Sequence, residues 1–117
     1  LNLAWGIDRM RNLGVKIDGV RLVGGGSKNP LWASILADAI GVPVSRLAEA
    51  ESAALGAALQ ALWTARRSTG DNPRLHDLAS PLIEMRDEPI EPDPERVAFY
   101  ADLGEAFRAA VEKQFGD

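Results

Sequence analysis

The sequence of 117 residues has no cysteine, a single histidine and few aromatic residues, which make up 6% of the chain. Without cysteine it forms neither a disulfide nor a thiolate metal site, and a cytoplasmic location, which we expect, is compatible with this composition. The one histidine, His76, lies in a segment without an evident partner. The sequence therefore offers no Ser/His/Asp set, no metal-binding cluster and no credible catalytic base.

The sequence also lacks an apolar run long enough to cross a membrane, a signal-peptide pattern and an excess of positive charge. Its formal net charge is -4, which argues against nucleic acids and anionic membranes as partners, since both bind basic surfaces. The chain begins with Leu1, inside a helical pattern, instead of with methionine. We therefore expect the sequence to be a piece of a longer protein.

The residues that are present are typical of a globular domain or part of one, with 46% hydrophobic and 26% charged residues. The spacing of apolar residues predicts a helix over residues 1–13, a strand over 20–23, a helix over 30–40 and a short extended segment over 42–44. A glycine follows each of these helices as a natural C-terminal stop. A helix followed by a strand, a second helix and a second strand predicts an α/β arrangement.

A longer helix is predicted from Glu49 or Ala50 to Ala65, with Glu49 and Glu51 well placed for the helix dipole. Its many alanines indicate close packing against another helix or a sheet. An amphipathic helix over 95–115 completes the chain. Its apolar face is formed by Val97, Tyr100, Leu103, Phe107 and Val111.

The chain thus divides into residues 1–66, an irregular stretch over 67–94 with one helical turn near 75–78, and the final helix over 95–115. We expect the stretch to be a solvated surface excursion, because prolines and acidic residues alternate in it. At most two strands are visible, too few for an independent sheet covered by helices. The remaining strands of the sheet are therefore expected outside this sequence.

Three consecutive glycines, Gly24, Gly25 and Gly26, link the predicted strand to the helix that begins at Pro30. Such a run allows positive φ three times in succession and leaves no Cβ in the way of a ligand. The sequence lacks the spacing of a dinucleotide fingerprint and of a phosphate-cradling P-loop. Two interpretations stay open: a loop on which a nucleotide lies against the backbone, or a purely structural loop.

Asn29 is the other candidate in this region. Its side chain can cap the helix that starts at Pro30, and the same amide can face a purine ring. Ser27 and Lys28 are ambiguous. Asp38, in the following helix, is interpreted as a surface charge or an ion-pair partner.

Four segments stand out together: Val20-Arg-Leu-Val-Gly-Gly-Gly-Ser-Lys-Asn-Pro-Leu-Trp32, Ile35-Leu-Ala-Asp38, Gly41-Val-Pro-Val44 and Glu51-Ser-Ala-Ala-Leu-Gly-Ala-Ala-Leu59. At this spacing they resemble the C-terminal part of the FGGY family of carbohydrate kinases, with a likeness over residues 1–63. The resemblance implies part of an actin/hexokinase/Hsp70-like (ribonuclease H-like) ATPase domain, with the active site in the cleft between two domains. It also implies transfer of the γ-phosphoryl group of ATP to a sugar hydroxyl with Mg²⁺.

By this resemblance Gly24, Gly25 and Gly26 form the loop that lies against ATP or ADP, and Asn29 contacts the adenine. The resemblance places no catalytic residue and no metal ligand in this chain. It assigns the catalytic aspartate, the phosphate-binding loops and the sugar-binding residues to an absent upstream part, which we expect to bind a pentulose. The chain alone is therefore expected to be inactive.

Two other functions stay open: a stand-alone nucleotide-binding or regulatory module, and a helical interaction module whose glycines serve packing only. In each case an incomplete sheet exposes an edge that invites self-association.

Overall fold

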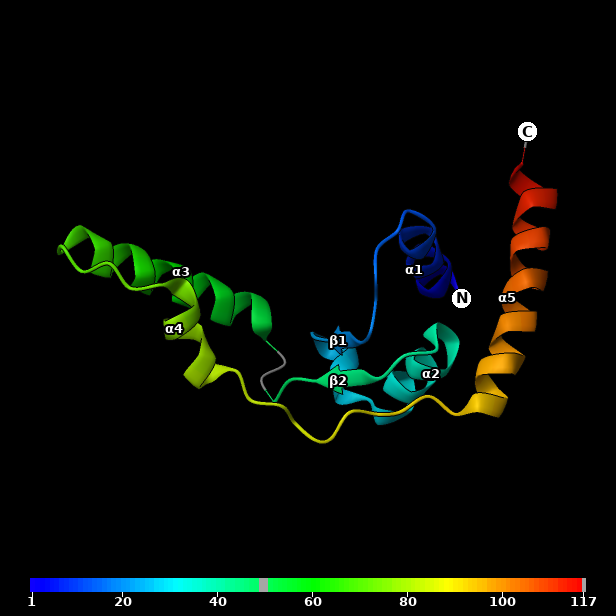
Figure 1. Ribbon diagram of the computed structural model, residues 1–117, viewed down its shortest axis with the longest axis horizontal. Helices are drawn as coiled ribbons and strands as arrows, with labels where there is room; N and C mark the ends of the chain where they lie inside the picture. Colours follow the sequence, from blue (N-terminus) through cyan, green and yellow to red (C-terminus); the bar gives the residue numbers. More distant parts are fainter. Residues whose placement is uncertain (49–50, 117) are drawn as a thin grey trace.

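A computed structural model of the chain describes residues 1–48 and 51–116 (Figure 1). Within these residues the elements follow in the order α1 (Asn2–Asn12), β1 (Val20–Leu22), η1 (Gly25–Lys28), α2 (Pro30–Ile40), β2 (Val44–Arg46), α3 (Ser52–Ser68), α4 (Leu75–Ala79), η2 (Ser80–Leu82) and α5 (Pro94–Phe115), where η denotes a 3-10 helix. The predicted helix-rich α/β composition with two strands is confirmed.

The core lies between α2 and the two strands. β1 and β2 are parallel, with Val20 paired to Val44 and Leu22 paired to Arg46, and α2 connects them. Small and branched side chains let the helix approach the strands closely, and their burial is the main stabilising term of the fold. The buried cluster consists of Ala33, Leu36, Ala37, Ile40, Val42 and Val44.

Both ends of α2 follow from local sequence signals. At the start, Asn29 accepts a hydrogen bond from the Trp32 backbone N–H at 3.2 Å, and Pro30 occupies the first helical position. At the end, Gly41 adopts the left-handed conformation with φ +72°. The extended segment predicted over 42–44 is displaced, since β2 begins only at Val44.

The Asn29 cap provides a test of local stability. We expect Asn29→Ala to lower the free energy of unfolding by about 1 kcal/mol, because the Trp32 N–H loses its acceptor. Asn29→Ser keeps an acceptor oxygen and serves as the matched control. Its free energy of unfolding should fall by only a few tenths of a kcal/mol. Urea unfolding of the two variants measures the difference, and equal midpoints for both would contradict the capping role.

Residues 84–89 are exposed, as their composition predicts, but this stretch is more ordered than an irregular surface excursion, because residues 84–90 also pair with the sheet. They run antiparallel along β2, where Val44 and Ile90 exchange both backbone hydrogen bonds, at 3.0 and 2.9 Å, and Arg86 N–H donates to the Arg46 carbonyl at 2.9 Å. This pairing occupies one edge of β2. In the part of the chain that the structure describes, the far edge of β1 has no pairing strand, so self-association at that edge stays a prediction.

α5 is attached to α2 by a buried carboxylate. Asp38 is 3% exposed, and its Oδ1 accepts from the Asp93 backbone N–H at 2.9 Å while Oδ2 pairs with Arg96 Nε at 2.8 Å. Asp93 in turn caps α5 by accepting from the N–H of Glu95 and Arg96. Asp38 is thus an ion-pair partner, as predicted, but the alternative of a surface charge is wrong.

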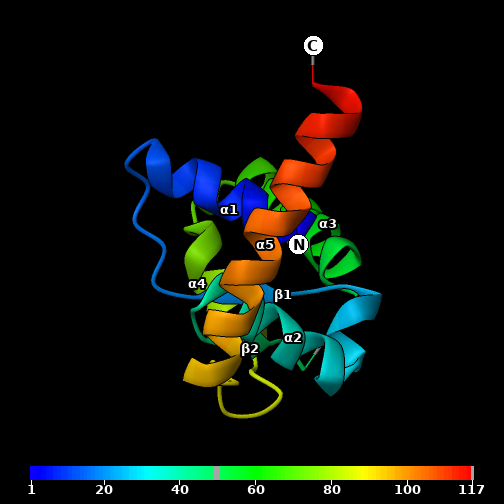
Figure 2. The ribbon, with the colours of Figure 1, turned by 90° about the vertical axis from the view of Figure 1, so that its right-hand side faces the viewer.

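The inner face of α5 agrees with the predicted apolar face at all but one position. Val97, Tyr100, Phe107 and Val111 are half-buried, whereas Leu103 is 40% exposed. The helix turns the smaller Gly104 inward instead, next to α1 and the end of α2. Figure 2 shows α5 in front of these two helices.

α3 differs most from its prediction. It starts at Ser52 and continues to Ser68, three residues beyond the predicted end, while Glu49 and Ala50 lie outside the described residues. Its small residues do not pack closely against any other part of the chain that the structure describes, because they are exposed; they are Ala53, Ala54, Gly56, Ala57, Ala58 and Ala61. Leu59 is buried, on a helix that contacts α4, and Trp63 Nε1 donates to the Pro73 carbonyl at 2.9 Å.

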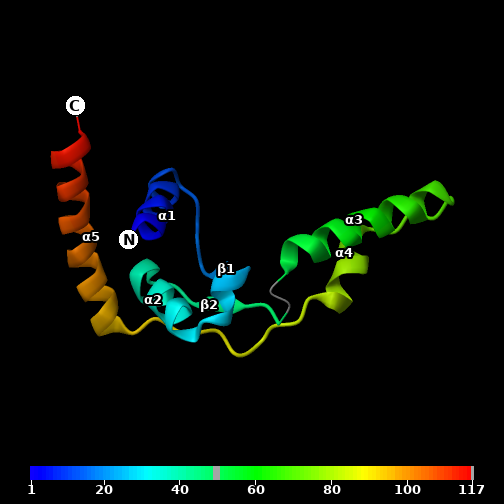
Figure 3. The same ribbon diagram turned by 180° about the vertical axis from the view of Figure 1, so that it is seen from behind.

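The chain has an extended shape, with α5 at one end and α3 and α4 at the other (Figures 1 and 3). Its radius of gyration is 18.4 Å, against about 13 Å for a compact domain of this length. Its accessible surface of 8257 Å² exceeds the roughly 6,200 Å² expected for a compact monomer of this mass. None of the helices in residues 1–48 and 51–116 combines the length and the apolarity needed to cross a bilayer.

Candidate functional site

The glycine loop, residues Gly24–Asn29, connects β1 to α2. Gly24 has φ +77° and ψ -169°, a conformation that is restricted to glycine. Gly25 and Gly26 instead open the short helix η1 and have no positive φ. Of the three positive φ values that the glycine run allows, the loop thus uses one, because hydrogen bonding within the loop closes a helical turn immediately after Gly24.

Ser27 holds this turn together from the inside. It is fully buried, and both its backbone N–H and its Oγ donate to the Gly24 carbonyl, at 3.0 and 2.7 Å. On the α2 side, the Trp32 indole lies against Gly26, where an added Cβ would stand 3.2 Å from Trp32 Cδ1. Sequence reasoning left Ser27 ambiguous and gave Trp32 no role in the loop, since neither contact has a signal beyond close sequence spacing.

The outer surface of the loop is open. Gly25, Gly26 and Asn29 are exposed, and a Cβ added at Gly25 would meet nothing within 4 Å. Asn29 uses one lone pair of Oδ1 for the Trp32 N–H, so the amide retains a second lone pair and its N–H donors for a ligand. The structure brings the four predicted site residues together as a backbone platform with an amide at its edge.

Arg46 and Asp87 lie behind the loop. The Arg46 side chain is 12% exposed, its Nη1 is 3.5 Å from the Ser27 carbonyl oxygen, and its Nη2 forms an ion pair with the Asp87 carboxylate. Asp87 comes from the 84–90 segment that pairs with β2. Sequence reasoning missed both residues, because 41 positions separate them and no local pattern marks either.

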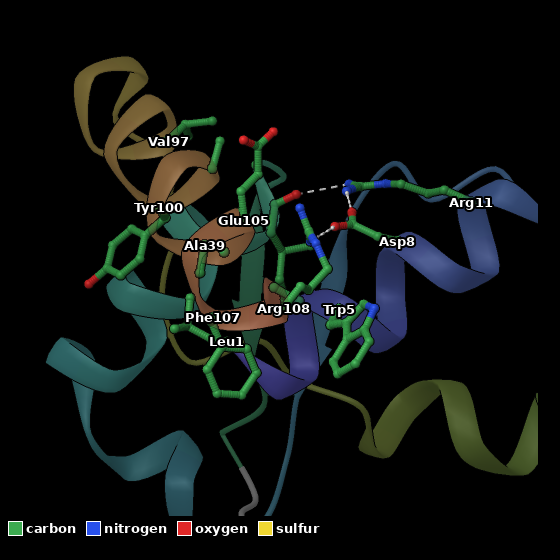
Figure 4. A pocket seen from close by; sticks show the side chains of 15 residues that line it. Leu1, Trp5, Asp8, Arg11, Ala39, Val97, Tyr100, Glu105, Phe107 and Arg108 are labelled. Carbon is green, nitrogen blue, oxygen red and sulfur yellow. Dashed lines mark hydrogen bonds and ion pairs between the residues drawn. The ribbon is translucent and has the colours of Figure 1, made fainter. Parts of the chain in front are cut away.

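A pocket of about 230 Å³ lies between α1, the end of α2 and α5 (Figure 4). In it, Asp8 accepts a hydrogen bond from Arg11 at 3.2 Å and pairs with Arg108 at 3.6 Å, while Arg11 Nη2 donates to the Ile40 carbonyl at 2.9 Å. Because these charged side chains pair with one another and with the end of α2, we interpret the pocket as a region where the three helices contact each other. The pocket is also at the opposite end of α2 from the glycine loop, one helix length or about 16 Å away.

Two further titratable groups, His76 and Asp77, lie on α4 and outside the glycine loop. The pKa of Asp77 is held below its usual value by the hydrogen bond from Arg74 and, to a smaller extent, by His76, while partial desolvation acts in the opposite direction. His76 is itself exposed, and it contacts Ser80. Across residues 1–48 and 51–116, no three histidine or acidic side chains are grouped as metal ligands.

Comparison with known proteins gives the loop its context. The model of the FGGY family of carbohydrate kinases, C-terminal domain, matches residues 1–65. The xylulose kinase of Haemophilus influenzae is 44% identical over 61 residues, which are 52% of this chain and 12% of that protein. The autoinducer-2 kinase of Salmonella paratyphi B is 33% identical over 106 residues, which are 86% of this chain and 18% of that protein. The chain thus spans less than a fifth of the length of these relatives.

Solved structures confirm the fold. A ligand-bound xylulose kinase and a gluconate kinase, both from Lactobacillus acidophilus, each superpose with a TM-score of 0.62 at 24% identity, over 87% of this chain and 20% of theirs. The predicted actin/hexokinase-like fold, with a sheet that is incomplete in this chain, agrees with these neighbours. With its glycine loop inside the matched residues, this chain belongs to the FGGY family of carbohydrate kinases, whose C-terminal domain its residues 1–65 match.

Proposed function

We propose that the protein containing this chain is an ATP-dependent sugar kinase and that this chain supplies the wall of its active site that binds adenosine. The observation that carries the proposal is the exposed glycine loop at the start of α2, within the residues that match the family. In this proposal the adenosine lies on Gly24, Gly25 and Gly26. Asn29 faces the adenine edge with its N–H donors and its second lone pair, a pairing that suits adenine.

D-Xylulose is the proposed phosphoryl acceptor, with D-xylulose 5-phosphate and ADP as products. The 44% identity to a xylulose kinase supports a pentulose. The longer match to an autoinducer-2 kinase supports autoinducer-2 as the alternative acceptor. The cytoplasm, where ATP is available, is the proposed compartment.

The chain is proposed to be inactive alone. Phosphoryl transfer depends on positioning and on charge stabilisation around the transferred group. Mg²⁺ would neutralise phosphate charge there, and we propose that other parts of the protein would hold it. The large accessible surface and the exposed alanines of α3 support a chain that is completed by further sequence.

Gly25→Val tests the adenosine wall. We expect the dissociation constant for ATP of the full-length protein to rise at least tenfold, because the valine side chain would occupy the face proposed for the nucleotide. The thermal midpoint should stay unchanged, since a Cβ at Gly25 meets nothing within 4 Å. Calorimetric titration and thermal melting measure the two quantities.

Gly6→Val is the matched control, because Gly6 is exposed on α1 and a Cβ there also meets nothing within 4 Å. This variant should bind ATP as the wild type does. Unchanged ATP affinity in Gly25→Val would remove the loop from the nucleotide site.

A further inference from the structure

We propose that Asp87, from the segment beyond the family match, is a positioning residue for the nucleotide loop and that it acts through Arg46. This inference rests on the proposed function, because it assigns a role in ATP affinity to residues that do not touch the nucleotide. The contacts that carry it run from Asp87 to the Arg46 guanidinium and from that guanidinium to the Ser27 carbonyl.

Backbone pairing fixes Asp87 opposite Arg46. The 84–90 segment is held to β2 by the Val44–Ile90 bridge on one side of Asp87 and by the Leu47–Met85 bridge on the other. Arg86 N–H also donates to the Arg46 carbonyl at 2.9 Å. The carboxylate therefore comes from a bend over residues 86–88 that is anchored to β2 by a bridge on either side.

The ion pair directs Arg46 towards the loop. Its side chain is largely buried, and a buried guanidinium needs a charged partner to remain in place. With Nη2 engaged by Asp87, Nη1 lies 3.5 Å from the Ser27 carbonyl oxygen. Ser27 in turn holds the Gly24 carbonyl by two hydrogen bonds, so the contact reaches the backbone of the glycines.

Loss of the carboxylate would release the loop without removing any surface on which a nucleotide lies. Arg46 would turn towards solvent to recover hydration, and η1 would lose the contact behind Ser27. A less ordered loop must be ordered again upon binding, which weakens ATP affinity. Because adenosine is remote from the transferred phosphoryl group, this loss affects the ground state and the transition state alike.

The test uses the full-length protein, with Asp87→Asn, Asp87→Glu and the control Glu88→Gln. Glu88 is the adjacent exposed acid, so its variant changes net charge by the same amount. For Asp87→Asn we expect the dissociation constant and the KM for ATP to rise about three- to tenfold, with kcat and the KM for the sugar unchanged. Asp87→Glu should restore ATP affinity to within twofold of the wild type, and Glu88→Gln should leave it unaltered.

Two further results would overturn the inference. One is wild-type ATP affinity in Asp87→Asn. The other is a fall in thermal midpoint and kcat at constant KM for ATP, which would indicate a merely structural ion pair. If the wild-type protein itself neither binds ATP nor phosphorylates any pentulose or polyol, the proposed function fails first and the inference fails with it.

Discussion

Replacement of Asp38 by alanine is expected to lower the free energy of unfolding by about 3 kcal/mol. The carboxylate is 3% exposed, and it accepts from the Asp93 N–H at 2.9 Å and from Arg96 Nε at 2.8 Å. Alanine leaves the backbone donor unpaired next to the core, and a hydrogen bond to a charged group contributes about 1.5–3 kcal/mol. The Arg96 contact contributes less than its length suggests, because that side chain is 60% exposed.

Urea unfolding of the chain, followed by tryptophan fluorescence, measures this loss. Asp102→Ala is the control, since Asp102 is an exposed carboxylate on the same helix α5 and its removal should cost less than 0.5 kcal/mol. In Asp38→Ala, limited proteolysis should also cleave faster near residue 93, where α5 begins. Equal unfolding midpoints for the two variants would show that Asp38 does not hold α5 to α2.

Gly24→Val is expected to cost about 2–3 kcal/mol of stability and to abolish measurable ATP binding by the full-length protein. The backbone at Gly24, with φ +77° and ψ -169°, excludes L-residues with a Cβ. A valine forces this peptide into another conformation and carries with it the Gly24 carbonyl, which accepts two hydrogen bonds from Ser27. Loss of both would open the turn η1.

Two matched substitutions separate backbone strain from side-chain bulk. Gly25→Ala, one residue later at negative φ and in open space, should leave stability unchanged or raise it by about 0.5 kcal/mol. A semisynthetic chain with D-alanine at position 24 should keep wild-type stability, because the mirror-image residue prefers this conformation. Destabilisation by D-alanine as large as that by valine would rule out strain as the cause.

Much of α2 and of the site was predictable because its signals are local. Asn29 caps the helix that Pro30 begins, and Gly41 ends it, so three residues within or next to one helix define its bounds. The glycine loop follows directly from its position between β1 and α2. The same residues also carry the likeness to the FGGY family, which the comparisons confirm.

The environment of these elements was not predictable. The burial of Asp38 depends on Asp93, 55 positions away, and the place of Arg46 depends on Asp87, 41 positions away. The acidic, proline-rich composition of residues 84–90 gives no sign that they pair with β2. A hydrophobic pattern indicates which face of an element is apolar, but it does not indicate which distant polar group will contact that element.

The place of the glycine loop and the two ends of α2 follow from neighbouring residues, and the family follows from the spacing of four short segments, so the amino-acid sequence is sufficient for all three. That one glycine of the three takes positive φ and that Ser27 holds the turn became visible in the structure, although the hydrogen bonds responsible are local. Contacts between distant residues place Arg46 and Asp87 behind the loop and bury Asp38. These latter features depend on hydrogen bonds and ion pairs that form once the chain has folded back on itself, when burial makes a missing partner costly.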